Sequence, residues 1–554
     1  MTMKTLPKKL LLLLLVLTIS AGCKKDYLSF DYTDGNIRAD DVWNSDRNSR
    51  GFLNTTYAGL INAYNVDNDG ALLASASDEA VNSNANSSIN IINNGTWGPL
   101  RTIDDQYGAM YTAIRRTNLF LENSTTSAIT PATDIPRLRG EAYFLRAMYH
   151  FELMKRYGAI ILSTRSYTTT DNLDVPRNTV EEVVAQIVAD CDEAVKVLPA
   201  SHAEWGAGDK GRATGSAALA LKSRVLLYAA SPLYNQTNII EKWNAAATAA
   251  KQLIDLNKHS LLTLAQLANL WDFSVAASNY SPELIFATSV TAGNTIERNN
   301  APISYEGKGR TNPTEELVNA FEMRVSGKPI NDVTSGYSAA NPYSTTGATA
   351  RDPRLALFII YNGQNFKSKA VETFVGGKDN VPTNVDNTKT GYYLRKFLSE
   401  SAAWATGTTA VNRNRPWILF RYAETLLNYA EALNEVNGPT ADVYTYVNQV
   451  RQRAGMPSLP AGLSQDEMRA RIQNERRVEL CFEGHRFFDV RRWKKGAEFF
   501  NKPVSGIQIV KTGTNFTYNK FTVENRIFTD KNYLYPFPQI EMNKLKNLAQ
   551  NPGY

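Results

Sequence analysis

The sequence predicts a mainly α-helical protein, a scaffold of packed helix pairs with long irregular loops and a few short strands. Apolar residues recur at helical spacing over paired stretches of the 554 residues. The pairs are residues 106–123 with 136–157, 179–198 with 214–234, and 417–437 with 441–453. This organisation is tetratricopeptide-like, although the spacing is too irregular for a strict repeat of about 34 residues.

The third pair shows why neighbouring helices are expected to pack back on one another. Residues 417–437 carry one apolar stripe at three- and four-residue spacing. Gly438 tolerates the left-handed geometry that ends a helix, and Pro439 can open the next one. Alanines are frequent in residues 217–230 and 245–250, and their small side chains allow neighbouring helices to pack closely.

Long polar segments rich in Asn, Thr, Ser and Gly fit no helix template. They are residues 80–100, 291–312, 327–350, 376–391 and 400–415. Loops on a rigid scaffold commonly carry recognition. We expect short strands near them, at residues 284–290 and 355–361, and one body over residues 23–554 with an inserted loop subdomain at roughly 290–415.

The N-terminus reads as a lipoprotein signal peptide over residues 1–22. Lys4, Lys8 and Lys9 precede a short apolar run, which is too short to cross a hydrocarbon core of roughly 30 Å. Small residues then stand directly before Cys23, whose thiol and new amine can both be acylated. The alternative is an ordinary secretory signal with a chance cysteine. We favour cleavage before Cys23 and a lipid anchor on it.

Composition excludes several classes of function. The net charge of +6 falls to +3 once the three signal lysines are removed, and basic and acidic residues are interspersed. That pattern lacks the electrostatic footprint of a nucleic-acid-binding protein. Besides Cys23, only Cys191 and Cys481 remain, too few for a disulfide framework. No second apolar run approaches membrane-spanning length.

A block near the C-terminus, residues 464–493, is the most distinctive part of the chain. Ser464 and Glu467 form a capping-box pattern that predicts a helix start. Glu475, Arg476, Glu479 and Glu483 then recur at helical spacing, followed by His485 and Arg486. A catalytic interpretation would use the glutamates with His485 as acid and base. We favour structural ion pairs, because carboxylates interleaved with arginines commonly form them.

Residues 472–493 resemble the C-terminal signature of the SusD/RagB family of outer-membrane nutrient-binding lipoproteins. Further segments agree with that family in the same order: residues 140–147, 218–230, 420–432, 535–538 and 550–554. The resemblance spans the whole mature chain. It implies a SusD-like fold and a cell-surface lipoprotein of the outer membrane. It also implies a non-catalytic protein that captures oligosaccharides and delivers them to a SusC-like TonB-dependent transporter; some members instead capture peptides.

Ligand contacts are expected in the loops, because the recurrent signature residues belong to the scaffold. Trp97 and Tyr305 lie in Asn- and Gly-rich segments and could stack on a pyranose ring, with Trp404 a further candidate. The hydroxyl groups would be bonded by three polar residues, Asp78, Asn94 and Arg310. For Trp97 the alternative is packing against Tyr107 or Tyr111 of the following helix.

Two other classes of function stay open. A glycoside hydrolase cannot be recognised or dismissed from sequence, because its two carboxylates come from distant positions. Metal, serine and nucleotide chemistry have no matching motif, so no cofactor and no metal are predicted. A helical-repeat scaffold that binds only proteins would explain the helix pairs but would give the long polar loops no role.

Overall fold

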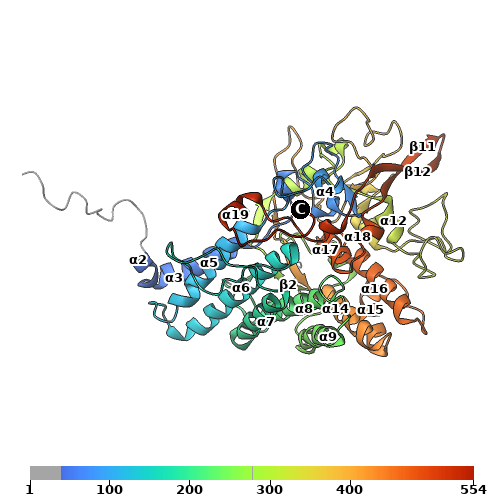
Figure 1. Cartoon of the computed structure of the whole chain (residues 1–554). Coiled ribbons are helices and arrows are strands. Elements are labelled where there is room, and N and C mark those ends of the chain that lie inside the picture. The colour runs from blue at the N-terminus through green and yellow to red at the C-terminus, as the bar shows by residue number, and fades with distance from the viewer. Residues whose placement is uncertain (1–38, 207, 277–278) are drawn as a thin grey trace, which may run out of the picture.

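The computed structural model describes residues 39–206, 208–276 and 279–554, so the signal peptide and Cys23 lie outside the described residues. Consecutive helices pack side by side in a row along one side of the molecule, as Figure 1 shows. The scaffold helices are α2 (Ala39–Trp43), α3 (Asp46–Thr56), α5 (Tyr107–Asn123), α6 (Ile135–Tyr157), α7 (Val180–Val197), α8 (Gly215–Ala230), α9 (Ile240–Asp255), α14 (Tyr422–Asn437), α15 (Ala441–Arg453), α16 (Gln465–Glu479) and α17 (His485–Arg492).

The predicted fold class is confirmed, and the helix starts follow the predicted chemistry. Thr179 caps α7 and Ser464 caps α16, each in a capping box with a glutamate three residues on. The α14–α15 turn uses Gly438 with φ of 71°, which glycine adopts without steric cost. Cys191 is buried on the inner face of α7, as a small hydrophobe would be.

The rest of the chain forms short elements above the helical row. The short helices are α4 (Asn90–Asn93), α10 (Leu264–Leu267), α11 (Thr295–Asn300), α12 (Glu315–Ala320), α13 (Arg354–Phe358), α18 (Gly496–Phe499) and α19 (Gln539–Lys544). The strands are β1 (Ala80–Val81), β2 (Leu284–Ala287), β3 (Thr291–Gly293), β4 (Asn312–Pro313), β5 (Ile359–Ile360), β6 (Asn365–Phe366), β7 (Lys369–Ala370), β8 (Tyr393–Leu394), β9 (Arg413–Arg415), β10 (Ile418–Arg421), β11 (Pro503–Thr512) and β12 (Asn515–Asn525).

All the strand pairs are antiparallel and two-stranded, and two of them form a stem for the loops between α9 and α14. Strand β2 pairs with β10, and β3 pairs with β9. Helix α9 then packs directly on α14, so the helical row continues past the loops. The stem lies at the ends of the predicted inserted subdomain, whose assignment as a separate unit stays a prediction. A longer hairpin, β11–β12, projects from the loop side in Figure 1.

Two sequence predictions need correction. The helix expected from residue 417 begins only at Tyr422, because β10 pairs with β2 across the stem. The strand expected over residues 355–361 is helical through Phe358, and only β5 is extended. There Asp352 accepts a hydrogen bond from the backbone N–H of Arg354 at 2.9 Å, a local cap that favours the helix. The strand expected at 284–290 forms over β2.

The C-terminal block is held by buried ion pairs, as the sequence predicted. Glu475 contacts Arg354 at 2.6 Å and Arg451 at 3.1 Å, and Glu479 lies 2.7 Å from Arg421. Arg476 lies 3.2 Å from a carboxylate oxygen of Asp489. These side chains are at most 2% exposed, apart from Asp489 at 3%. The glutamates therefore belong to the scaffold and are not free to act as acid or base.

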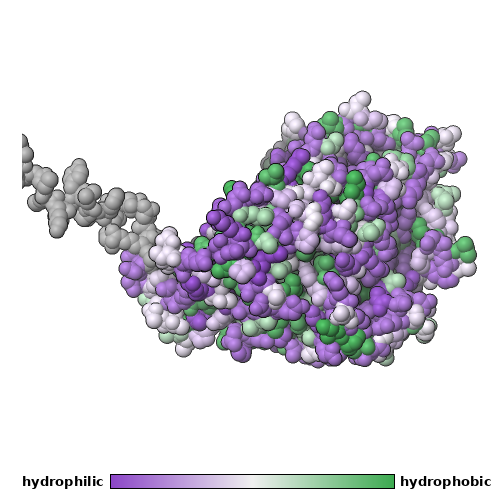
Figure 2. Space-filling view, in the orientation of Figure 1, coloured by the Kyte–Doolittle hydropathy of each residue, from purple (hydrophilic) through white to green (hydrophobic). Residues whose placement is uncertain are grey.

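Polar residues cover most of the face shown in Figure 2, with apolar residues in scattered patches. Within residues 39–206, 208–276 and 279–554, no helix is both long and apolar enough to cross a membrane.

Candidate binding pocket

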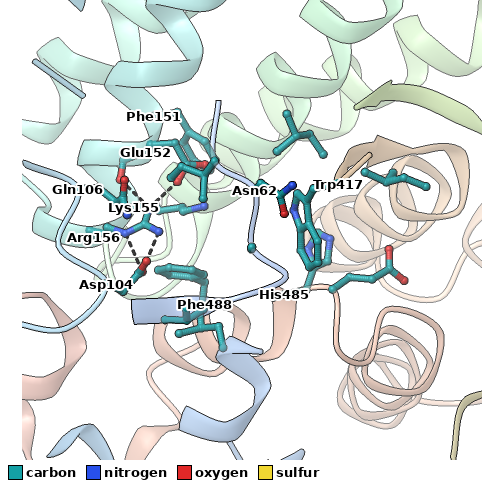
Figure 3. Close-up of a pocket in the computed structure, with 18 of the residues that line it drawn as sticks. Asn62, Asp104, Gln106, Phe151, Glu152, Lys155, Arg156, Trp417, His485 and Phe488 are labelled. Carbon is teal, nitrogen blue, oxygen red and sulfur yellow. Dashed lines mark hydrogen bonds and ion pairs between the residues drawn. The ribbon is translucent and has the colours of Figure 1, made fainter. Parts of the chain in front are cut away.

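A cavity of about 130 Å³ lies between the helical row and the C-terminal block. Its walls come from α6, α8, the start of β10 and the start of α17, and the turn at residues 61–67 lies at its edge. Figure 3 shows Lys155 and Arg156 of α6 on one side, and Trp417 and His485 on the other. The pocket is therefore built by segments from both ends of the chain.

The α6 side of the pocket is charged but internally neutralised. Arg156 donates to Asp104 through Nε at 2.9 Å and Nη2 at 2.8 Å, and the hydroxyl of Tyr535 donates to the same carboxylate oxygen at 2.9 Å. Lys155 donates to Glu152 at 2.7 Å. Burial lowers the pKa of Lys155 to about 8, against the opposing effect of the Glu152 carboxylate. The ammonium thus stays mostly protonated at neutral pH.

The opposite side is mainly aromatic, and its one lining carboxylate, Glu483, is paired with Lys396 and Arg421. Trp417 packs edge-on against Tyr64 with ring centroids 4.9 Å apart, which fixes its orientation. Burial lowers the pKa of His485 to about 4, so its ring is neutral at pH 7. Among the described residues, no group forms a hydrogen bond with that ring. Both ring nitrogens of the neutral His485 side chain therefore remain available to bond a ligand. Phe488 lies on the α6 side, below Lys155 in Figure 3, with the Lys155 ammonium 4.7 Å from its ring centroid.

Side-chain amides stand at the mouth of the pocket. Asn62 and Asn65 are exposed, and each uses its carbonyl oxygen to accept a backbone N–H, from Tyr64 at 3.2 Å and from Gly70 at 2.6 Å. Their NH2 groups stay available. The same two asparagines also line a second hollow of about 370 Å³, which reaches Thr295 and Arg415 of the loop region. The turn at residues 61–67 thus separates the pocket from a hollow on the loop side.

The structure buries Trp97 and Asp78, so neither side chain is exposed to a ligand in the way that the sequence prediction expected. Trp97 is 1% exposed and packs edge-on against Tyr535 at 4.5 Å, so neither ring face is open. Its partners are Tyr535 and Tyr554 at the C-terminus; the expected partners were Tyr107 and Tyr111. Asp78 is 1% exposed, and both its oxygens are paired with Arg486 and Arg477.

Tyr305 and Trp404, by contrast, lie together on the loop side, partly buried against one apolar cluster that contains Phe366. The Tyr305 ring is 5.3 Å from that of Phe366, and its hydroxyl donates to the Phe366 carbonyl. The ammonium of Lys367 lies 4.3 Å from the centroid of the Trp404 ring. Both aromatics keep part of their surface exposed, so their role in ligand binding stays a prediction.

The two remaining predicted polar residues lie apart from the pocket lining. Asn94 is exposed and accepts a hydrogen bond from the backbone N–H of Thr96 at 3.1 Å. Arg310 is half-buried and lies 2.6 Å from the carboxylate of Asp386, and it also donates to Ser83 at 3.0 Å. Arg310 thus stabilises the loops, whereas the amide of Asn94 faces solvent.

Sequence reasoning missed the pocket residues Lys155, Trp417 and His485. Trp417 was assigned to the start of a helix, and His485 was considered only as a catalytic acid or base, so neither was recognised as lining a cavity. A signal existed only in the segment 61–68, where Asn and Asp alternate with apolar residues. Among the described residues, no cluster of His, Cys, Asp and Glu is placed to hold a metal ion.

Together these features define a helical-repeat scaffold whose loop layer and aromatic, amide-lined pocket suit the recognition of a polar ligand. The chain belongs to the SusD family, whose model matches residues 275–554. A second family model, described as "Starch-binding associating with outer membrane", matches residues 37–227.

Relatives and solved structures agree with this membership. The chain is 27% identical over 426 residues to SusD-like protein P2 of Formosa agariphila, covering 75% of this chain and 73% of the relative. It is 25% identical over 456 residues to SusD-like protein P38 of the same organism, covering 75% and 77%. A SusD-like protein from Bacteroides fragilis NCTC 9343 superposes with a TM-score of 0.79 at 29% identity, covering 93% of this chain and 99% of that one.

Another Bacteroides fragilis structure, described as a SusD-like carbohydrate binding protein, superposes with a TM-score of 0.76. It is 24% identical and covers 92% of this chain and all of its own, so it supports the shared fold alone.

Proposed function

We propose that this protein captures oligosaccharides at the cell surface, anchored by lipid on Cys23 in the outer membrane, and delivers them to a SusC-like TonB-dependent transporter without breaking any bond. Membership of the SusD family and the starch-binding, outer-membrane description of the matching model support this proposal. The observation that carries it is the pocket, where aromatic rings and unused amide groups of Asn62 and Asn65 face one cavity. Sugars need this combination of apolar ring contact and hydrogen bonding.

Two of the carboxylates that line the pocket, Glu152 and Glu483, are unsuited to act as a general acid, whereas burial raises the pKa of a third, Asp67, so Asp67→Asn is the carboxylate variant to test for cleavage. A glycosidase needs a carboxylic acid whose pKa is raised so that it can protonate the leaving oxygen. Although burial opposes it, Lys155 and Arg156 hold the pKa of Glu152 at about 2. The carboxylate of Glu483 is likewise held below its ordinary pKa, against burial, by Arg421 and Lys396. Both are committed to ion pairs and present no proton at neutral pH.

The test is an array of oligosaccharides and peptides probed with the chain from residue 24 onward, followed by calorimetry on each binder. Asn62→Ala and His485→Gln should each weaken oligosaccharide binding by about tenfold, the effect of losing one well-placed polar contact, on the order of 1.4 kcal/mol. Asn172→Ala, an exposed asparagine outside the pocket, is the matched control and should bind as the parent does.

Three outcomes would contradict the proposal. Binding of peptides but no glycan would favour the peptide-capture alternative. New reducing ends released from a bound glycan, lost in a carboxylate variant of this chain, would show an enzyme. Binding unaffected by both pocket variants while they stay folded would place the site elsewhere. Co-purification of the lipid-anchored chain with its co-expressed transporter tests the delivery step separately.

A further inference from the structure

The pocket offers a ligand no uncompensated positive charge. Each basic residue of its lining has a carboxylate partner within the protein: Lys155 with Glu152, Arg156 with Asp104 and Arg224 with Glu424. These pairs are 2.7, 2.8 and 2.5 Å long. His485 is neutral at pH 7. An anionic ligand group would therefore find no free cation to replace its lost hydration.

The edge of the pocket is instead negative. Asp67 lines the pocket, and its carboxylate accepts the backbone N–H of Asp104 at 3.2 Å through each oxygen. Burial raises the pKa of Asp67, and the nearby carboxylates of Asp104, Asp69 and Asp105 add to that effect. In the part of the chain that the structure describes, Asp67, Asp69 and Asp105 form no ion pair. Only Asp104 is neutralised, by Arg156.

The turn that presents Asp67 is held in place by the protein. Asp67, Asn68 and Asp104 all have φ between 50° and 60°, a left-handed conformation that costs free energy for residues with a side chain. Asn65 ties the turn through its bond to the N–H of Gly70 at 2.6 Å. Asp69 accepts hydrogen bonds from Ser87 at 2.6 Å and from the backbone N–H of Ser88 at 2.8 Å. The carboxylates at the pocket edge are therefore fixed.

We propose that the pocket accepts an uncharged sugar residue and rejects uronate and sulfated residues, with Asp67 as the residue that determines this selectivity and Asp69 and Asp105 reinforcing it. The neutral groups left unused in the pocket, the ring of His485 and the amides of Asn62 and Asn65, bond sugar hydroxyls, and Trp417 and Phe488 supply the apolar contact. A carboxylate or sulfate in the same position is repelled by the fixed negative charge. This repulsion lowers the affinity for acidic sugars relative to neutral ones. This inference rests on the proposed capture of oligosaccharides and narrows its substrate class.

The experiment uses a glycan array with matched pairs on one backbone: xylan with and without glucuronate branches, methyl-esterified and free galacturonan, and neutral and sulfated galactan. We expect the parent protein to bind uncharged members, and the acidic partner of any bound glycan to bind at least about tenfold more weakly. Because the repulsion is electrostatic, raising the salt concentration should narrow that difference.

Asp67→Asn keeps the acceptor for the Asp104 N–H and removes the charge, so it should raise the affinity for acidic partners while leaving that for neutral glycans nearly unchanged. Asp40→Asn, at an exposed aspartate of α2 near the far end of the helical row in Figure 1, is the matched control and should change neither. An acidic glycan bound as tightly as its neutral partner overturns the proposal alone. If no glycan of either charge binds, oligosaccharide capture itself is wrong, and this inference falls with it.

Discussion

Arg486 of the C-terminal block and Asp78 near the N-terminus form a two-point ion pair, with Nε 2.8 Å from one carboxylate oxygen and Nη2 2.9 Å from the other. Both side chains are at most 4% exposed. Arg477 reaches the same carboxylate at 2.9 Å. Although burial opposes them, these arginines hold the pKa of Asp78 well below its ordinary value. These arginines of the C-terminal block thus join the two ends of the chain and close the fold.

Removing one partner of these ion pairs should lower stability before it lowers affinity. Asp78→Asn, or truncation of Glu475, Arg476, Glu479 or Arg486, leaves a buried charge without its partner, which typically costs about 3–5 kcal/mol. Thermal unfolding measures this. Glu193→Gln, in an exposed pair with Lys196, should leave the melting temperature nearly unchanged. Unchanged melting together with lost ligand binding would show that the pairs serve the site.

Glu79 should make stability fall as pH rises. Burial raises its pKa to about 8, and the neighbouring Asp78 carboxylate adds to the shift, although the N–H of Phe482 opposes it. Its ordinary pKa is 4.5, so the folded protein holds a proton that the unfolded chain releases. The stabilisation is complete below about pH 4.5 and is lost as pH rises through about 8. Glu79→Gln should therefore flatten the pH dependence of the melting temperature between those values; an unchanged pH profile would contradict the assignment.

Trp97→Ala should unfold the protein more easily and change ligand affinity little in the folded fraction. The ring is enclosed by Tyr535 and Tyr554, and truncating a buried tryptophan costs about 3–5 kcal/mol. Denaturant unfolding measures the stability, and calorimetry at low temperature measures the affinity. If the variant melts at the same temperature as the parent and no longer binds glycan, Trp97 contacts the ligand.

Cys23→Ala should release the protein from the membrane. The expectation rests on the lysines and short apolar run before Cys23, because these residues lie outside the described part of the chain. Detergent partitioning and surface labelling of the parent and the variant measure the effect. If the variant still partitions into detergent and stays at the cell surface, another anchor must exist.

Local patterns predicted the helices well, because periodicity and caps such as Ser464 and Glu467 act within a few residues. Sequence reasoning failed where contacts with a distant segment of the chain determine the local structure. Trp417 and the strand after it look helical, yet the Trp417 N–H donates to Thr288, 129 residues earlier. The pocket escaped notice for the same reason, since Lys155 and His485 meet only in three dimensions. The packing partners of Trp97 were missed because the C-terminal tyrosines that cover it follow more than 400 residues later.

The loop aromatics Tyr305 and Trp404 should contribute to binding beyond the pocket. They share one apolar cluster, and Glu306 accepts the backbone N–H of Thr406 at 3.0 Å, so the two loops are joined and present their rings together. A well-packed aromatic anchor commonly costs about 2 kcal/mol on truncation, near a thirtyfold loss of affinity. Tyr305→Ala and Trp404→Ala should each approach that loss in calorimetry with the cognate glycan.

Chain length of the glycan separates this prediction from a general loosening of the loops. A short oligosaccharide held only in the pocket should bind Tyr305→Ala as tightly as the parent, whereas a longer one that reaches the loops should lose affinity. Tyr305→Phe is the control, because it keeps the ring face and removes only the hydroxyl that donates to the Phe366 carbonyl. Its affinity for the longer glycan should match the parent's if stacking is the contact. Equal affinity of both alanine variants and the parent for every glycan length would remove the loop aromatics from the site and leave the pocket to bind alone.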